Sequence, residues 1–256
     1  MGIVAAGLGL LVGLALGLLG GGGSVLAVPS LVYILGESPH EATTGSLIII
    51  IASSLSGVAA HARAGRVQVR AGLGFGLAGL ATSIISAALS KGLPETVVLV
   101  GFAGVMLTAA AMMWRSAKAL DHGPVPGRQG TGGLRTILAG AGVGVLIGVF
   151  GVGGGFLAVP ALVAVAGFTM PNAVGTSLLI IALNSSAALA TRVAGSHVDW
   201  AVILPFAAAA SVAAVVGQRA SSRFRAATLQ QTFAGLLVLL AGWVLLDQLV
   251  LHTSSN

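Results

Sequence analysis

The chain has 256 residues, of which only 18 are formally charged: 12 Lys or Arg and 6 Asp or Glu. Soluble domains carry about 25% charged residues, whereas this chain carries 7%, is 56% hydrophobic and has a mean hydropathy of +1.04. This composition indicates a membrane protein and excludes a soluble enzyme and a nucleic-acid-binding domain. The absence of cysteine also excludes a disulfide scaffold.

Ten apolar segments follow one another along the chain. They are residues 3–19, 25–35, 42–60, 71–89, 96–114, 134–150, 156–167, 173–190, 201–216 and 226–246. A membrane-spanning helix needs about 20 residues, so segments 25–35 and 156–167 are too short to cross. Each of these two short segments follows a cluster of glycines, at 20–23 and at 151–155. We therefore predict a broken helix at each cluster.

The two halves of the chain have similar sequences at a constant offset of 131 residues. Pro29 aligns with Pro160, and the alignment holds without a gap through the glycine clusters and a second matching group near Ser46 and Ser177. The predicted fold is an all-α membrane protein of two four-segment repeats, each opening with a glycine-broken, discontinuous or re-entrant helix. The predicted repeats are residues 1–117 and 134–256, joined by a cytoplasmic linker at 118–133.

The basic residues predict the topology. Arginine and lysine concentrate in the loops 62–70, 115–135 and 219–225, and such loops are typically cytoplasmic. If each broken unit is a hairpin that returns to its side of entry, all three loops share one side and the second repeat is inverted. If each broken unit crosses once, the chain crosses eight times, the repeats are parallel and loop 219–225 falls outside. The charge pattern favours the inverted arrangement.

The two glycine clusters belong to longer motifs that occur once in each half of the chain. Residues 17–29 read Gly-Leu-Leu-Gly-Gly-Gly-Gly-Ser-Val-Leu-Ala-Val-Pro, and residues 148–160 read Gly-Val-Phe-Gly-Val-Gly-Gly-Gly-Phe-Leu-Ala-Val-Pro. With residues 42–46, 173–177 and 198–200, they resemble the sulfite exporter TauE/SafE family of bacterial permeases. The resemblance implies a multi-pass carrier of small sulfur-containing or organic anions, such as sulfite or sulfoacetate, in the bacterial cytoplasmic membrane. The first half departs from the family's common Gly-Thr-Ser order, which the second half keeps at 175–177.

The candidate substrate site is the pair of glycine clusters together with nearby hydroxyl and amide side chains. A helix that begins just after a glycine break offers unpaired N–H donors and the positive end of its dipole to an anion. The predicted substrate-binding residues are Gly20, Gly21, Gly22, Gly23, Ser24, Thr44, Ser46, Gly151, Gly153, Gly154, Gly155, Thr176, Ser177 and Asn184. The alternative for the hydroxyls is a hydrogen bond back to their own helix. The alternative for glycine is close helix packing, which we expect for Gly7, Gly9, Gly13, Gly142 and Gly144.

Five residues near the ends of apolar segments are candidates for gating or coupling: His40, Glu41, His61, Arg63 and Arg192. Their alternative role is that of solvated residues at the level of the lipid headgroups. No predicted segment has a carboxylate at its centre, which argues against a cation pump. No metal-ligand spacing, nucleotide motif or catalytic triad is present, so we expect no metal, no cofactor and no enzymatic activity.

The predicted function is secondary transport of small anions by alternating access, with the substrate held between the two glycine breaks. The expected partners are the anion and the lipid bilayer, and no nucleic acid. A homodimer is left open. The alternatives are an anion or neutral-solute channel, and a membrane assembly partner that transports nothing.

Overall fold

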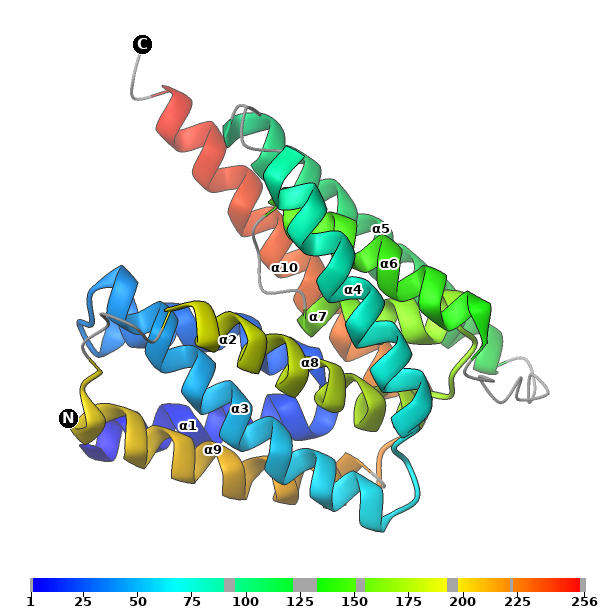
Figure 1. Ribbon diagram of the computed structural model, residues 1–256, viewed down its shortest axis with the longest axis horizontal. Helices are drawn as coiled ribbons and strands as arrows, with labels where there is room; N and C mark the ends of the chain where they lie inside the picture. The colour runs from blue at the N-terminus through cyan, green and yellow to red at the C-terminus, as the bar shows by residue number, and fades with distance from the viewer. Residues whose placement is uncertain are drawn as a thin grey trace.

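The computed structural model describes residues 2–89, 95–121, 133–150, 155–192, 198–221 and 223–253. All regular elements within these ranges are helical (Figure 1). They are α1 (Gly2–Leu19), η1 (Gly21–Gly23), α2 (Ser24–Pro29), η2 (Ser30–Ile34), α3 (Pro39–Arg63), α4 (Val69–Leu89), α5 (Glu95–Asp121), α6 (Leu134–Phe150), α7 (Gly155–Pro160), η3 (Ala161–Val165), α8 (Met170–Arg192), α9 (Trp200–Ser221) and α10 (Ala226–Thr253). Seven helices are long and apolar enough to cross a membrane, and Leu134–Val149 is a shorter apolar helix. The predicted all-α membrane class is confirmed.

Several helices continue past the ends of the predicted apolar segments. The clearest case is α5, which runs to Asp121, so the first four residues of the predicted linker are helical. Charged residues stop an apolar run, but lysine and aspartate side chains on a helix end that reaches water do not break the helix. Residues 122–132 of the predicted linker lie outside the described residues.

The start of α3 shows how the local sequence places a helix end. Ser38 is the N-cap: its Oγ accepts a hydrogen bond from the Glu41 backbone N–H at 3.3 Å. The same hydroxyl donates to Glu41 Oε2 at 2.6 Å, and Pro39 occupies the first helical position, where its missing N–H costs nothing. This Ser-Pro-His-Glu sequence therefore begins the helix with its first donors satisfied.

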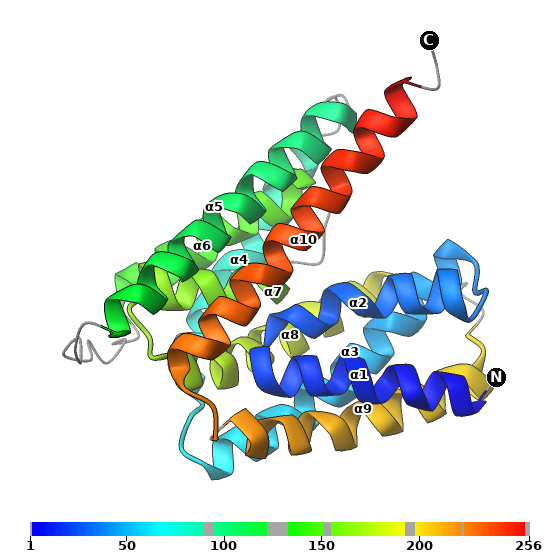
Figure 2. The same ribbon diagram turned by 180° about the vertical axis from the view of Figure 1, so that it is seen from behind.

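The helices form two bundles that meet along α8. Helices α1, α2, α3, α8 and α9 make the first bundle, and α4, α5, α6, α7 and α10 make the second (Figures 1 and 2). Helix α8 contributes to both hydrophobic cores: Val174 and Ile180 pack into the core of the second bundle, and Leu178 and Ile181 into that of the first. Each bundle takes helices from both halves of the chain.

The connections between helices gather at two ends of the molecule. The N-terminus, the α2–α3 connection, the start of α9 and the C-terminus lie toward one end (Figures 1 and 2). The α3–α4 connection, the end of α5, the start of α6 and the α9–α10 connection lie toward the other. The three predicted basic loops begin or end at these last positions, so we call this the basic end.

Glycines bring two helix pairs into backbone contact. On α1, Gly9, Gly13 and Gly17 lie against the backbone of Phe206, Ala210 and Ala214 of α9; on α6, Gly140, Gly144 and Gly148 lie against Phe75, Gly79 and Ser83 of α4. Adding 131 to the α1 and α4 positions returns the α6 and α9 positions. The predicted packing role is thus confirmed for Gly9, Gly13 and Gly144. It is wrong for Gly7 and Gly142, which have no neighbour within 4 Å of a β-carbon position.

We expect Gly144→Ala to destabilise the protein and Gly142→Ala, on the same helix, to leave its stability nearly unchanged. A β-carbon at Gly144 would collide with the backbone of Gly79 and with Thr82, and overpacking of this kind costs about 1–3 kcal/mol. The measurement is the unfolding midpoint of the purified variants in detergent. Equal midpoints for the two variants would contradict the packing role of Gly144.

Candidate functional site

The first predicted helix break is present at Gly20. This residue has φ 73°, a left-handed conformation that favours glycine, and its N–H donates to Leu16 O at 2.8 Å, which closes α1. The chain then makes one 3₁₀ turn, η1, before α2 begins at Ser24. In the second half, Gly151, Gly153 and Gly154 lie outside the described residues, and α7 begins at Gly155.

Both short segments end in the same way. Six-residue α2 ends at Pro29 and is followed by a five-residue π-helix, and α7 ends at Pro160 with a π-helix of the same length. Proline lacks the N–H of a regular turn and pushes against the carbonyl four residues earlier, so the wider π-turn follows it. Glycines with φ 75° then stop the segments, at Gly36 and Gly167.

The two broken segments meet at the centre of the molecule. Helix α7 contacts η1, and a β-carbon at Gly155 would lie 3.0 Å from Ser24 Oγ. Gly20 lies against Ser177 of α8 and Val159 of α7. The structure therefore brings Gly20, Ser24, Gly155 and Ser177, all predicted site residues, into one neighbourhood.

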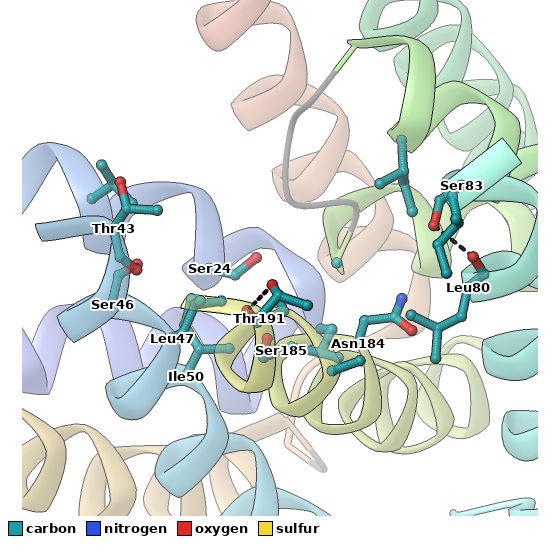
Figure 3. A pocket seen from close by; sticks show the side chains of 17 residues that line it. Ser24, Thr43, Ser46, Leu47, Ile50, Leu80, Ser83, Asn184, Ser185 and Thr191 are labelled. Carbon is teal, nitrogen blue, oxygen red and sulfur yellow. Dashed lines mark hydrogen bonds between the residues drawn. The ribbon is translucent and has the colours of Figure 1, made fainter. Parts of the chain in front are cut away.

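A cavity of about 480 Å³ opens beside this meeting point (Figure 3). Its walls come from both bundles and consist of Ser24, Val28, Thr43, Ser46, Leu47, Ile50, Leu80, Ser83, Ile84, Ile147, Gly155, Ile181, Asn184, Ser185, Ala187, Ala188 and Thr191. None of these lining residues is charged. In Figure 3, Thr43 and Ser46 lie toward one side of the cavity and Ser83 toward the other, with Ser24, Ser185 and Asn184 between them.

Most hydroxyls of the cavity wall bond to their own helix. Ser24, Ser46, Ser83 and Thr191 donate to backbone oxygens three residues earlier, at 2.7, 2.8, 2.9 and 2.7 Å. This is the alternative considered for membrane serine and threonine. These hydroxyls can still accept a hydrogen bond, but they would have to rotate before donating one to a ligand.

Asn184 differs from the hydroxyls. Its side-chain oxygen is buried and has no hydrogen-bond partner among the described residues. A buried amide oxygen without a donor is costly, and the NH₂ group of the same amide can donate to an anion. Asn184 therefore keeps hydrogen-bonding capacity that a ligand in the cavity could use.

Three predicted site residues are fully buried without lining the cavity. Thr44 Oγ1 donates to His40 O at 3.3 Å, Ser177 Oγ donates to Val174 O at 2.8 Å, and Thr176 Oγ1 accepts from the Gln68 N–H at 3.1 Å. Conversely, Ser83 and Thr191 line the cavity without having been predicted. The available signal was the polar pair Thr82-Ser83 inside the apolar segment 71–89.

The gating candidates lie at different depths. Glu41 belongs to the capping group of α3, while His40, Arg63 and Arg192 are exposed. His61 is fully buried, with Nε2 3.4 Å from Gly17 O. His61 is therefore not a solvated residue at the level of the lipid headgroups, which was its alternative role.

The sequence profile of the family described as "Sulfite exporter TauE/SafE" matches residues 5–244. The chain belongs to the sulfite exporter TauE/SafE family. It is 31% identical over 250 residues to a "Probable membrane transporter protein" of Xylella fastidiosa (strain 9a5c), covering 95% of this chain and 94% of the relative. It is 28% identical over 258 residues to the "Probable membrane transporter protein YunE" of Bacillus subtilis (strain 168), with 91% and 93% covered. No solved structure shows a significant match.

The family and the seven membrane-length helices show that this TauE/SafE member is a multi-pass membrane protein. The names of the relatives support a membrane transporter. The predicted family is thereby confirmed. The particular substrate, the alternating-access mechanism and the predicted partners stay predictions.

The end of this TauE/SafE protein opposite the basic end carries three carboxylates close together. Partial burial of Glu37, with repulsion from Asp199 and then Glu41, raises the pKa of the Glu37 carboxyl above its ordinary value. Asp199 also caps the start of α9, since its Oδ1 accepts from the Ala201 N–H at 2.9 Å. The raised pKa means that ionised Glu37 is less favourable in the folded chain than in the unfolded chain.

We expect Glu37→Gln to raise the thermal midpoint at neutral pH and to have little effect in acid. Because the folded pKa is raised, the contribution of Glu37 to stability is full below its unfolded pKa and falls as the pH rises through the folded pKa. Glutamine removes that loss. Thermal unfolding across the acidic range measures the effect, and an identical shift at all pH values would contradict it.

Proposed function

We propose that this protein is a secondary transporter of small sulfur-containing or organic anions, such as sulfite or sulfoacetate, and that the central cavity holds the substrate. The observation that carries the proposal is the side-chain amide of Asn184 in the wall of an uncharged cavity, with its oxygen buried and without a partner among the described residues. That cavity lies where the two short helices α2 and α7 begin, at Ser24 and Gly155.

The lining suits reversible binding of an anion. An anion that leaves a fixed buried cation would leave that charge without a partner at a large cost, whereas neutral donors hold the anion more weakly. The apolar wall, including Leu47, Ile50, Ile147 and Ile181, would contact the organic part of a substrate such as sulfoacetate. The mixed wall therefore favours a small organic anion over a bare metal cation.

The arrangement of the bundles supports alternating access. The contact surface between α1 and α9 and that between α4 and α6 are related by the 131-residue offset, as expected of duplicated units that exchange their helices. Because the cavity walls come from both bundles, relative movement of the bundles would open the cavity toward one end and close it toward the other. We propose that the two halves are inverted repeats and that this movement carries the substrate.

The gathering of the basic connections at one end supports the hairpin topology, with the basic end in the cytoplasm of a bacterial cell and the carboxylate end outside. In this topology α1 and the α2–η2 segment form a hairpin that returns to its side of entry, and α6 with α7–η3 forms the inverted counterpart.

Binding is tested by thermal unfolding of the purified protein with sulfite, methanesulfonate or sulfoacetate. We expect at least one of these anions to stabilise the wild type, since a ligand at 100 times its dissociation constant adds about 2.7 kcal/mol. Asn184→Leu should reduce the shift. Asn172→Leu, on the same helix but away from the cavity, should keep it.

If the anions stabilise Asn184→Leu as much as they stabilise the wild type, the cavity is not their binding site. Uptake into liposomes that fails to saturate with anion concentration would favour a channel over a carrier.

The topology is tested by introducing single cysteines into the cysteine-free chain. We expect Arg63→Cys and Arg223→Cys, both at exposed positions of the basic end, to be protected from an impermeant thiol reagent in intact cells. Asp199→Cys, at the other end, should react. Opposite labelling of Arg63→Cys and Arg223→Cys would contradict the hairpin arrangement.

A further inference from the structure

His61 is a buried titratable group that the cavity does not use. It lies on the last turn of α3 with no exposed surface. Its Nε2 is 3.4 Å from the carbonyl oxygen of Gly17, three residues before the helix break at Gly20. Its Nδ1 is buried and has no partner among the described residues.

Arg66 supplies a second unpartnered nitrogen beside His61. Its backbone N–H donates to His61 O at 3.0 Å, and its Nη1 is buried without a partner in the described part of the chain. Gly175 of α8 lies against both the Arg66 carbonyl and the His61 Cβ. The end of α3 and the turn after it thus carry two side-chain nitrogens without partners, one on a permanent cation and one that becomes a donor when His61 is protonated.

The turn that carries Arg66 is attached to the predicted Gly175-Thr176-Ser177 motif. Gln68 N–H donates to Thr176 Oγ1 at 3.1 Å, while the next residue, Ser177, lies against Gly20. The motif therefore joins the helix break to the α3–α4 turn. That turn is also the connection between the first and the second bundle.

The charged groups around His61 are all positive. Helix α1 has no ionisable side chain, α8 has only Arg192 at its far end, α9 has only Arg219, and α4 has only Arg70. On α3 itself the nearest charge is Arg63, and Glu41 lies at the opposite end of that 25-residue helix. A proton on His61 would therefore have no carboxylate to offset its charge.

We propose that His61 and Arg66 form a second anion site, nearer the basic end than the cavity, where the transported anion and a proton bind together. The proposal rests on the proposed anion transport and adds its coupling ion. His61 lies eleven residues beyond Ile50 of the cavity wall, about 16 Å along the helix axis. The anion would reach it on the way between the cavity and the basic end.

The hydrogen bond to Gly17 explains why the two ligands bind together. The Gly17 carbonyl can only accept a hydrogen bond, so Nε2 carries the ring hydrogen and donates to it, and Nδ1 of the neutral ring can only accept. A proton taken from water by Nδ1 turns that nitrogen into a donor for the anion. If the proton binds to His61 without the anion, it adds an unbalanced buried charge beside Arg66. If the anion binds without the proton, it faces the lone pair of His61 Nδ1. Each ligand therefore raises the affinity for the other.

The site is closed in this conformation, because His61 Nδ1 and Arg66 Nη1 are both buried. The His61 Cβ and the Arg66 carbonyl lie against Gly175, where α3 and α8 meet the connection between the bundles. Movement of the bundles that opens the basic end would separate these elements and expose the two nitrogens to the anion. The coupled proton would then bind or leave in the state that is open toward the basic end.

The test measures proton uptake when sulfoacetate, which stays fully ionised near neutral pH, binds to the purified wild type. Calorimetric titrations at about pH 7 in two buffers of different ionisation enthalpy give the number of protons taken up. We expect net proton uptake in the wild type and none in His61→Gln. Glutamine can still donate to the Gly17 carbonyl but cannot take up a proton.

The matched pair Arg66→Gln and Arg70→Gln tests the second nitrogen. We expect Arg66→Gln to weaken sulfoacetate binding about tenfold or more, the loss typical of a hydrogen bond from a charged group. Arg70→Gln, which removes an exposed charge from the start of α4, should bind as the wild type does. Equal weakening in both variants would show a general charge effect and overturn the site.

Binding of sulfoacetate to the wild type without proton uptake would overturn the coupling and leave the proposed function intact, and this arm needs no variant. Proton uptake by His61→Gln equal to that of the wild type would show that another group takes up the proton. This result would also overturn the coupling. Failure of sulfoacetate, sulfite and methanesulfonate alike to bind the wild type would contradict the proposed function, and the coupling with it.

Discussion

Backbone hydrogen bonds broken inside a bilayer must be replaced by protein, because lipid offers no partner. The rest of this structure is arranged around that constraint. Helix α1 ends at Leu19, and after Gly20 the chain turns back through η1 into α2, so several backbone groups lose their regular helical partners. Helices α7 and α8 cover this break, with Ser177 and Val159 packed against Gly20. The break exists because helices from the other half of the chain enclose it.

The same enclosure explains the exchange of helices between the halves. Helix α1 packs on α9 and α6 packs on α4, through glycines that let the backbones touch. Helix α8 joins the two resulting bundles by contributing to both cores. Neither half could form its bundle alone, since each bundle needs helices of the other. The cavity between them is consequently made by residues far apart in the sequence.

Charge is scarce in this chain, and its placement matters for that reason. The polar groups of the cavity wall are all neutral, whereas buried His61 and partly buried Arg66, which can carry positive charge, lie toward the basic end. A path for an anion would then pass from weak neutral ligands to stronger cationic ones. Such a gradient would let the protein release its substrate at one end while requiring a proton at the other.

The sequence by itself determined the membrane class, where most of the long helices begin to within three residues, and the position of the first break. Hydropathy and the conformational preference of glycine act locally, so residues close in the chain suffice to predict these features. It also identified Ser24, Ser46, Gly155 and Asn184, which do line the cavity.

Only the tertiary structure decided that Thr176 holds the α3–α4 turn, that Ser83 faces the cavity and that His61 is buried against α1. These outcomes depend on which helices pack together. The hydrogen bond from Gln68 to Thr176 joins residues 108 positions apart. A periodic pattern along one helix shows which faces are apolar, but the partner that covers each face is chosen by the packing of the whole chain.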